Sequence, residues 1–473
     1  MKTKTFIFSL LFLLPSTIYC QNNNTQIFQG SWMGRITTDK FSFRALLRFE
    51  VTNDNIKGFL DLPDQSLYNL NTDKVWTIQD SVFVDATKSL NAGIFFKGRI
   101  LPGDSVVDGI WDWNKRGALS LKLSRYTLKT NLNPEIEGYR IIKLIESTPI
   151  KDQQATGLCW SFATTSFIET EAIRLGKSPV VLSPMFFVTP TVIDKAEKYI
   201  RMNGKSYFGA GDLTFSLLSA YKNYGAIPQI VYLGKKDSTS RYNHGEMDNT
   251  LLEKVKYYVN SGHGNMTTEG YRKEIGEILS RTLGKAPDTF MYRQKQYTPK
   301  SFAKEMVGIN PDDYVEITSF SHHPFYSKFI LEIESNWNNN YYLNLPINDF
   351  GNVVDYALSH NFSVCWDGDA YRHEGFNDGF AVLSDSINTI TQHMRQAAFD
   401  NHTTEDIHNM HIIGIAENDK GKRFYIVKNS SDQSNCGGYL YMSKEYLLLK
   451  TISVMVNKDA IPKEIKNKFS FVL

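Results

Sequence analysis

The sequence predicts an α+β protein in which a small all-β barrel or sandwich precedes a larger domain of helices and strands. Three observations support this class. Apolar and polar residues alternate in the first quarter of the chain, and apolar residues recur at helical spacing further on. The length of 473 residues is typical of two or three domains, at about 150 residues each.

The composition excludes several classes of protein. With 42% apolar, 13% aromatic and 22% charged residues, the chain is neither collagen-like nor wholly disordered. Lys and Arg together number 52 and Asp and Glu 50, so the net charge is +2. Such a chain has no overall basic field, and nucleic acid is not an expected partner.

The first twenty residues, 1–20, predict a secretory signal peptide. Lys2 and Lys4 precede an apolar run at 6–14, and a short polar stretch follows Pro15. The run is too short for a membrane-spanning helix, which needs about 20 residues, and no later stretch predicts one. We therefore expect an exported protein, whether periplasmic, secreted or at the cell surface. A lipid anchor at Cys20 and a buried first helix are the alternatives.

The cysteine count follows from that cleavage. Without Cys20 three cysteines remain, namely Cys159, Cys365 and Cys436. An odd number in an exported protein leaves at least one thiol that is free or pairs between chains. A bond between Cys365 and Cys436 stays open.

Residues 27–126 predict the β-domain. Alternation is clearest at 41–51, and further strands are expected at 56–62, 81–85, 93–100, 105–113 and 119–124. Residues 127–138 contain Asn133-Pro134 and predict a linker. The segments 30–34, 60–65 and 109–111 resemble the lipocalin-like β-domain that precedes catalytic domains in some secreted bacterial hydrolases. We expect a structural or docking role, with a ligand cup as the alternative.

Cys159 is expected to begin a helix that runs to Leu175, with Gly176 just beyond its end. Unpaired N–H groups and the dipole at a helix amino terminus favour the thiolate, which is the nucleophilic form. Gln153 precedes Cys159 by six residues. Its amide can donate to a developing oxyanion together with the Cys159 N–H, which is the arrangement that acyl transfer needs.

Residues 153–163, Gln-Gln-Ala-Thr-Gly-Leu-Cys-Trp-Ser-Phe-Ala, resemble the active-site segment of papain-like cysteine peptidases. Thr156 stands where many secreted members have a further cysteine, and this difference, with the runs 209–213 and 224–228, is closer to the bleomycin hydrolase and aminopeptidase C branch. The resemblance covers 139–473. It implies a two-lobed papain-like fold, peptide or protein substrates, and neither metal nor cofactor. An oligomer stays open. In that branch the carboxyl-terminal tail lies in the cleft and restricts binding to free amino ends.

Two histidines compete for the role of base. The family pattern sets the catalytic His six residues before a Gly, which selects His408 from Gly414 and leaves His411 as a packed residue of a strand. Metal binding by the pair is the weaker alternative, because its spacing suits a helix rather than a strand. Asn429 follows His408 by 21 positions, and its amide oxygen can fix the tautomer of the imidazole.

Two positions depart from the family pattern. Ser431 stands where the resemblance implies a Trp that shields the Asn–His hydrogen bond, and Gly211-Asp212 replaces a pair of glycines. We expect Gly211, Asp212 and Trp160 to contribute to substrate binding, and Asp212 is a candidate partner for a substrate amino group.

Cys159 and His408 are 249 positions apart, whereas a small papain-like domain needs about 130 to 150. We expect a helical insertion at about 240–320, with apolar stripes at 247–255 and 271–283 and a helix start at Thr298-Pro299. The adjacent His322 and His323 are expected to pack or to line the cleft, with metal binding as the alternative.

The function predicted from these residues is a cysteine-type peptidase. Cys159 attacks the carbonyl carbon, His408 moves the proton, Asn429 orients the imidazole and Gln153 donates to the oxyanion. An aminopeptidase is favoured. The alternatives are an endopeptidase and a catalytically inert papain-like protein that binds peptides.

Overall fold

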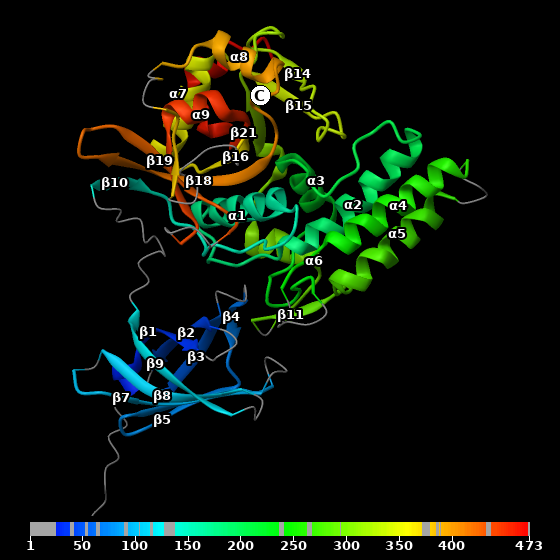
Figure 1. The fold of residues 1–473 in the computed structure, drawn as a ribbon. Coiled ribbons are helices and arrows are strands. Elements are labelled where there is room, and N and C mark those ends of the chain that lie inside the picture. The colour runs from blue at the N-terminus through cyan, green and yellow to red at the C-terminus, as the bar shows by residue number, and fades with distance from the viewer. Residues whose placement is uncertain are drawn as a thin grey trace, which may run out of the picture. The chain divides into compact units, whose positions relative to one another are not determined.

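The computed structural model describes residues 25–37, 42–52, 55–62, 67–88, 93–103, 105–113, 117–126, 138–235, 241–262, 267–293, 295–370, 379–384, 387, 389–431 and 437–471. The predicted signal peptide and Cys436 lie outside these residues. The described chain divides into two compact units, one made of residues up to 60 and 71–127, the other of 61–70 and 128–473 (Figure 1). Every described helix is too short or too polar to cross a lipid bilayer.

A nine-stranded sheet, preceded by a 3-10 turn at Thr25–Phe28, has the order β4-β3-β2-β1-β9-β8-β7-β6-β5. It contains the strands of the first unit together with the end of β3 and most of β4, which lie within 61–70. Its strands are β1 (Gly30–Thr37), β2 (Ser42–Thr52), β3 (Asn55–Leu62), β4 (Leu67–Asn71), β5 (Lys74–Ile78), β6 (Ser81–Ala86), β7 (Ile94–Ile100), β8 (Val106–Trp113) and β9 (Ala118–Tyr126). The predicted strands are present, and β1, β4 and β5 are additional. Pairing of β1 with β9 joins the two ends of the segment, so the all-β prediction is confirmed as one continuous sheet.

Alternation explains this sheet. Along β7 Ile94 and every second residue after it are buried and those between are more exposed, so one face of the strand packs inward. Trp32 is fully buried and donates from Nε1 to the Phe28 carbonyl at 2.8 Å. At Gly34 a Cβ would lie 2.3 Å from the Lys122 carbonyl oxygen, so this strand crossing requires glycine.

The larger unit contains a second sheet of ten strands. Its main path runs β14-β15-β13-β21-β16-β18-β19-β20-β17, and β10 pairs with the second half of β18. The bounds are β10 (Tyr139–Leu144), β13 (Tyr314–Thr318), β14 (Lys328–Ile330), β15 (Tyr341–Asn344), β16 (Val364–Gly368), β17 (Phe380–Ala381), β18 (His408–Asn418), β19 (Arg423–Lys428), β20 (Tyr439–Ser443) and β21 (Thr451–Asn457). The strands β16 and β18 are buried on both faces over most of their length, although β18 carries the polar residues His408, Asn409 and His411.

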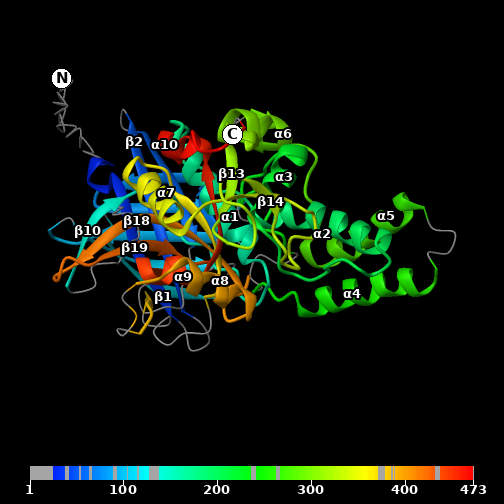
Figure 2. The same cartoon turned by 90° about the horizontal axis from the view of Figure 1, so that it is seen from above.

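Helices form the other lobe of this unit. They are α1 (Cys159–Arg174), α2 (Pro184–Arg201), α3 (Thr214–Tyr224), α4 (Gly245–Asn260), α5 (Thr268–Leu283) and α6 (Pro299–Phe302), with a hairpin of β11 (Phe290–Tyr292) and β12 (Lys295–Tyr297). The helix α1 is buried over almost its whole length, and Gly176 follows its end at a φ of +79°, as predicted. One apolar core joins α1 to α5, and Figures 1 and 2 show α4 and α5 extending side by side away from the sheet.

The predicted insertion therefore shares its core with the helices that precede it. The Thr267 hydroxyl accepts from the Gly270 N–H at the start of α5, and Thr298 forms a capping box with Ser301 at the start of α6. The start at Thr298 agrees with the sequence pattern, and the predicted stripe at 271–283 lies on α5.

The sheet carries α7 (Ile347–Ser359), α8 (Gln392–Asp400), α9 (Lys444–Lys450) and α10 (Lys463–Lys466). The carboxyl-terminal segment packs on this lobe: Phe469 stands edge-on to Tyr326 with ring centroids 6.0 Å apart, and Lys328 lies over the ring of Phe471. An α+β fold with a helical and a sheet lobe is thus confirmed for this unit.

Candidate active site

Cys159 is the first residue of α1, as the sequence predicts. The N–H groups of Ser161 and Phe162 return to the carbonyl of Leu158, so the N–H of Cys159 lies free of the helical ladder. Cys159 is 8% exposed as a whole residue. Burial raises its pKa to about 11, although the backbone N–H groups of Asn409, Trp160 and Cys159 itself lower it. Burial therefore outweighs the helix terminus, and the resting site favours the thiol over the expected thiolate.

His408 and Asn429 lie together at the adjoining ends of β18 and β19. The imidazole Nε2 is 2.7 Å from Oδ1 of Asn429. Because an amide oxygen only accepts, Nε2 carries the proton and Nδ1 keeps its lone pair. Burial lowers the pKa of His408 to about 4, and the bond to Asn429 raises it in part. The resting imidazole is therefore neutral.

Asn409 connects these residues to the sulfur, and the sequence reasoning did not single it out. Its Oδ1 lies 3.8 Å from Sγ of Cys159, and it directly follows His408 in the chain. The start of β18 thus brings the candidate base to the start of α1. The signal available in the sequence was only its position beside the chosen histidine.

Gln153 lies against the segment that follows Asn429. Its backbone N–H donates to the Ser430 carbonyl at 2.8 Å, and the Ser430 hydroxyl donates to its side-chain oxygen. Its Nε2 donates to the Thr156 carbonyl at 2.8 Å. These bonds fix the amide in one orientation, in which the nitrogen has a second N–H beyond the one used by Thr156.

Trp160 supports the loop at 209–212 rather than lying open to a ligand. The indole is fully buried and donates from Nε1 to the Ala210 carbonyl at 3.1 Å. A Cβ on Gly157 would stand 2.8 Å from the Cβ of Ala210, so the segment before the cysteine and this loop are in close contact. The described contacts of Trp160 are thus with the protein, and its contribution to substrate binding stays a prediction.

The Asp212 carboxylate is engaged in the interior, and its suggested role as partner of a substrate amino group stays a prediction. Asp212 is 3% exposed and forms an ion pair with Lys195 at 2.7 Å. Trp337 donates its indole N–H to both carboxylate oxygens at 3.1 Å. Lys195 also donates to the carbonyls of Gly209 and Gly211, at 3.2 and 2.6 Å. Lys195 thereby holds the loop in place. Substrate binding by the main chain of this loop stays a prediction.

At position 431 the missing indole is replaced by close main-chain packing. Gly438 has a φ of +88°, and a Cβ there would lie 2.3 Å from the Ser431 carbonyl oxygen and 2.9 Å from Ile150. The Asn429 N–H donates to the Gly438 carbonyl at 2.9 Å. The strand that enters β20 thus covers the turn that carries Asn429.

His411 is a packed histidine, as expected. It is fully buried on β18, and its Nδ1 lies 2.9 Å from the Ser166 hydroxyl, which also accepts from Lys428. Burial and the neighbouring Lys428 keep its pKa well below the ordinary value. Cys365 is likewise buried, as a free thiol beside Thr164.

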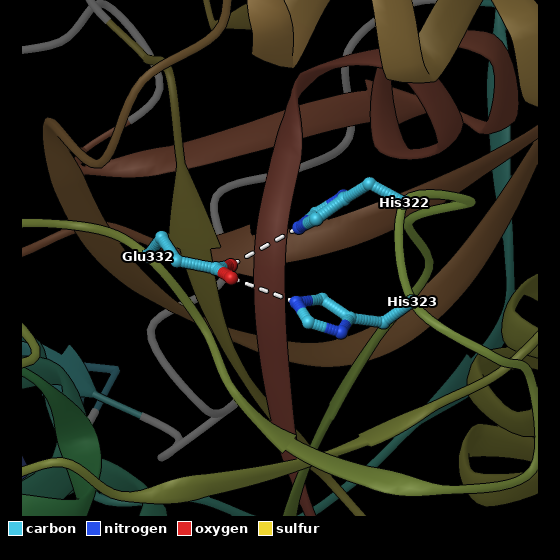
Figure 3. A group of neighbouring side chains, drawn as sticks. All are labelled: His322, His323 and Glu332. Carbon is cyan, nitrogen blue, oxygen red and sulfur yellow. Dashed lines mark hydrogen bonds and ion pairs between the residues drawn. The ribbon is translucent and has the colours of Figure 1, made fainter.

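His322, His323 and Glu332 are the described side chains whose metal-ligating atoms converge, within 4.8 Å of one another (Figure 3). Both imidazoles direct Nε2 at the carboxylate, at 3.0 Å for His322 and 2.7 Å for His323. Two imidazole N–H groups that donate to one carboxylate would give the same picture, so the protonation of Nε2 decides between a metal site and a structural group.

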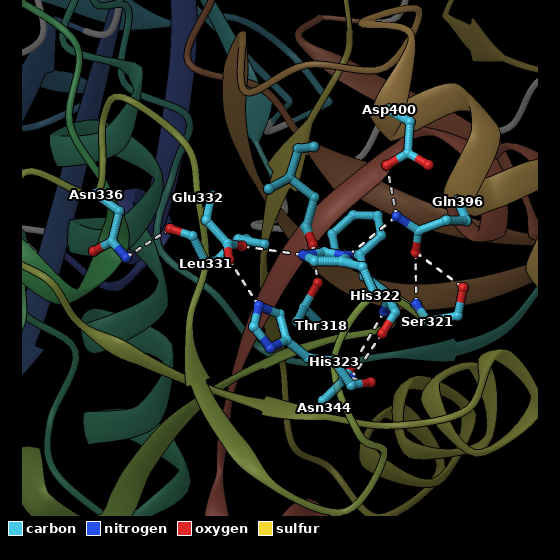
Figure 4. Close-up of polar contacts among 12 residues, drawn as sticks. Thr318, Ser321, His322, His323, Leu331, Glu332, Asn336, Asn344, Gln396 and Asp400 are labelled. Atoms are coloured by element: carbon cyan, nitrogen blue, oxygen red, sulfur yellow. Dashed lines mark hydrogen bonds and ion pairs between the residues drawn. The ribbon is translucent and has the colours of Figure 1, made fainter.

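The neighbour Gln396 decides this question for His322 (Figure 4). Its amide oxygen accepts from the Ser321 N–H at 2.5 Å, and its nitrogen donates to Asp400 at 2.8 Å and to Nδ1 of His322 at 3.1 Å. Nδ1 therefore accepts, and the proton sits on Nε2, where a metal would need a lone pair. The group fits packing, the reading that the sequence favoured.

Comparison with known proteins gives a consistent result. A model of the Peptidase C1-like family matches residues 209–471, more than half of the chain. Aminopeptidase C of Lactobacillus helveticus is 22% identical over 392 residues, which cover 73% of this chain and 87% of that protein. Aminopeptidase W of Lactobacillus delbrueckii subsp. lactis is 27% identical over 217 residues, 41% of this chain and 49% of that protein.

A solved structure shares the fold. The crystal structure of pepw from Lactobacillus rhamnosis superposes with a TM-score of 0.57 at 20% sequence identity, covering 72% of this chain and 85% of that one. The predicted papain-like two-lobed architecture and the resemblance to the bleomycin hydrolase and aminopeptidase C branch are thereby confirmed.

Proposed function

Because this chain belongs to the Peptidase C1-like family, whose members are cysteine peptidases, we propose that it hydrolyses peptide bonds by a Cys–His–Asn mechanism and that it acts as an aminopeptidase. The observation that carries the proposal is the hydrogen bond of His408 to Asn429, beside a sulfur at the start of α1. Residues 139–473 would form the peptidase domain, with the helical insertion at about 240–320. The lipocalin-like β-domain at 27–126 and the linker at 127–138 would precede it.

The resting protonation states define the first step. A neutral His408 accepts the thiol proton on Nδ1 as the sulfur attacks the carbonyl carbon, so the thiolate forms at the moment of attack. Asn429 accepts from Nε2–H and stabilises the imidazolium that results. The N–H of Cys159 and the second N–H of Gln153 donate to the oxyanion.

The remaining steps release both products. The imidazolium gives its proton to the leaving amine, and the C–N bond breaks to leave an acyl group on the sulfur. Water then loses a proton to His408 as it attacks, and the thiol is restored. Every step uses groups of this chain, water and the peptide.

Labelling with an epoxide inhibitor of thiol peptidases tests the mechanism. Stoichiometric modification of Cys159 that is lost in His408→Ala is the expected result, with Cys365→Ala as the matched control that still labels. Folded protein that stays unlabelled would instead support the alternative, an inert peptide-binding protein.

Comparison of fluorogenic peptides with free and acetylated amino ends tests the specificity. An aminopeptidase hydrolyses only the free peptides, whereas equal rates would identify an endopeptidase. The names of the two curated relatives favour the first outcome.

We also propose that the protein is exported, on the pattern of residues 1–20. Amino-terminal sequencing of the protein from its native host tests this. A mature chain that begins near residue 21 is expected, an acylated Cys20 would show the lipid anchor, and an intact Met1 would contradict export.

A further inference from the structure

Beside Cys159, a row of buried polar side chains crosses the sheet. On β18 Asn409 contacts the sulfur, and its partner in register on β16 is Asp367. Asp367 is in turn the partner of Ser453 on β21, whose hydroxyl donates to Glu316 of β13 at 3.1 Å. All four residues are at most 3% exposed. A sheet face at this depth is ordinarily apolar, because burying polar groups is costly. The row of polar side chains therefore indicates a functional site.

The row lies on the face of the sheet that packs against α1. Cys365 of β16 contacts Thr164 of α1, and Asp367 is two residues further along the same strand. Alternate residues of a strand share a face, so Asp367 points to the side where Cys159 lies.

Asp406 brings a second carboxylate to this place. It precedes His408 by two residues, is half-buried, and accepts from the Ser335 hydroxyl. Its charge acts on the Cys159 thiol and raises the pKa of that thiol in part. It also acts on Asp367, whose pKa burial raises well above the ordinary value. Burial and the neighbouring charge of Asp406 thus both raise the pKa of Asp367 and favour its protonated form.

The described residues leave this pair without a cation of its own. Neither carboxylate oxygen of Asp367 receives a hydrogen bond from a donor, and the buried hydroxyl of Tyr342, which feels the charge of both carboxylates, also lacks a partner among the described residues. Lys195 is the cation that acts on Asp406, and it is already bound to Asp212 and to the loop at 209–212. Buried carboxylates are ordinarily paired, so an external cation would complete the group.

We propose that Asp406 and Asp367 form an acidic subsite that binds a positively charged group of the peptide substrate, either the α-ammonium at its amino end or a Lys or Arg side chain. The assignment rests on the proposed peptidase function and deepens it by naming the substrate class. Asp406 forms the accessible edge of the subsite, and Asp367 its floor.

The described part of the carboxyl-terminal segment, residues 458–471, packs on the sheet lobe. Lys468 pairs with Asp349, Phe469 contacts Tyr326, and Lys328 lies over the ring of Phe471. Asp212 is already engaged by Lys195. Asp406 and Asp367 are therefore the carboxyl groups that we assign to the cation.

Binding measurements in the Cys159→Ala background test the subsite apart from catalysis. Isothermal titration would compare three peptides that differ only in charge: a free amino end with norleucine, the same peptide acetylated, and the acetylated peptide with Lys in place of norleucine. We expect at least one cation to improve the Kd about tenfold, and Asp406→Asn to abolish that gain. The arm that responds identifies the α-ammonium or the side chain.

Asp459→Asn on the exposed 3-10 turn after β21 is the matched control and should keep the gain. Asp367→Asn should act like Asp406→Asn, with near-UV circular dichroism as the check on its fold. Equal affinity for charged and neutral peptides, or a gain that survives Asp406→Asn, would overturn the subsite. Neither result bears on the mechanism, which is tested separately by the labelling of Cys159 and by the activity of Cys159→Ala.

Discussion

The two units of this protein fill their interiors with different chemistry. In the sheet of β1 to β9 the described core is apolar, and its buried polar side chains are Thr25, Asp61 and Thr77. The larger unit buries many more polar groups, among them Lys151, Glu169, Lys195, Asp212, Glu316, Asp367, Arg395 and Lys428. Buried charge is costly unless it is paired. Its concentration in the larger unit therefore indicates a core built around a functional site, whereas the apolar core of the β-sheet serves stability.

Among the tests of this comparison, replacement of Cys159 in the larger unit is expected to have the largest effect, which is on peptide hydrolysis. Cys159→Ala removes the nucleophile, and we expect kcat/KM for an unblocked peptide to fall by about 10⁴-fold or more. Cys365→Ala removes the other described buried thiol, which lies on β16 away from His408, and should hydrolyse peptides close to the wild-type rate. Activity that survives in Cys159→Ala would place the chemistry elsewhere.

The ion pair of Lys195 with Asp212 is the next test, since it separates buried charge from ordinary packing. Lys195→Met leaves a buried carboxylate without its cation, and we expect the free energy of unfolding to fall by about 3 to 5 kcal/mol in urea denaturation. Adding Asp212→Asn should restore part of this loss, because the amide still accepts from Trp337. Additive losses in the double variant would show that the pair contributes little.

Trp32 offers the matching test in the first unit. Trp32→Phe removes the indole N–H from the buried Phe28 carbonyl, and we expect a loss of about 1 to 3 kcal/mol. Calorimetry should show this loss in one transition, with peptide hydrolysis unchanged. A simultaneous loss of hydrolysis would show that the β-domain supports the active site.

The sequence was sufficient to predict an element where one short local pattern determines that element. The alternation at 41–51, the apolar stripes of α4 and α5, and Gly176 each agree with the structure because local spacing fixes them. The strands β4 and β5 escaped prediction, since each is only five residues long and too brief to establish a period.

The site itself was predictable only in part. His408 and Asn429 meet because β18 and β19 are neighbours, which the family pattern implied. Asn409 and Asp367 are brought together by the register of β18 and β16, and Lys195 comes from a helix 213 positions before His408. No local sequence pattern encodes either arrangement. The state of the Cys159 thiol also escaped, because the sequence placed it at a helix terminus but did not show its depth of burial.

The smallest expected effect is on the acid limb of the pH profile of kcat/KM, because burial of His408 sets the pH at which activity is lost. His408 accepts a proton only when neutral, so activity is lost as the pH falls through its pKa. Burial sets that pKa at about 4, and kcat/KM should therefore stay near its plateau at pH 5.5. An exposed imidazole, with a pKa of about 6.5, would already leave only about a tenth of the activity at that pH.

Two variants identify the group that titrates in this acid limb. Asp406→Asn should leave the limb at the same pH, which excludes the carboxyl pair as the titrating group. Asn429→Ala should shift the limb to lower pH, because the amide raises the pKa of His408. A limb near pH 6.5 would mean that the imidazole works in contact with water, and that the buried charges of this unit serve its stability rather than its chemistry.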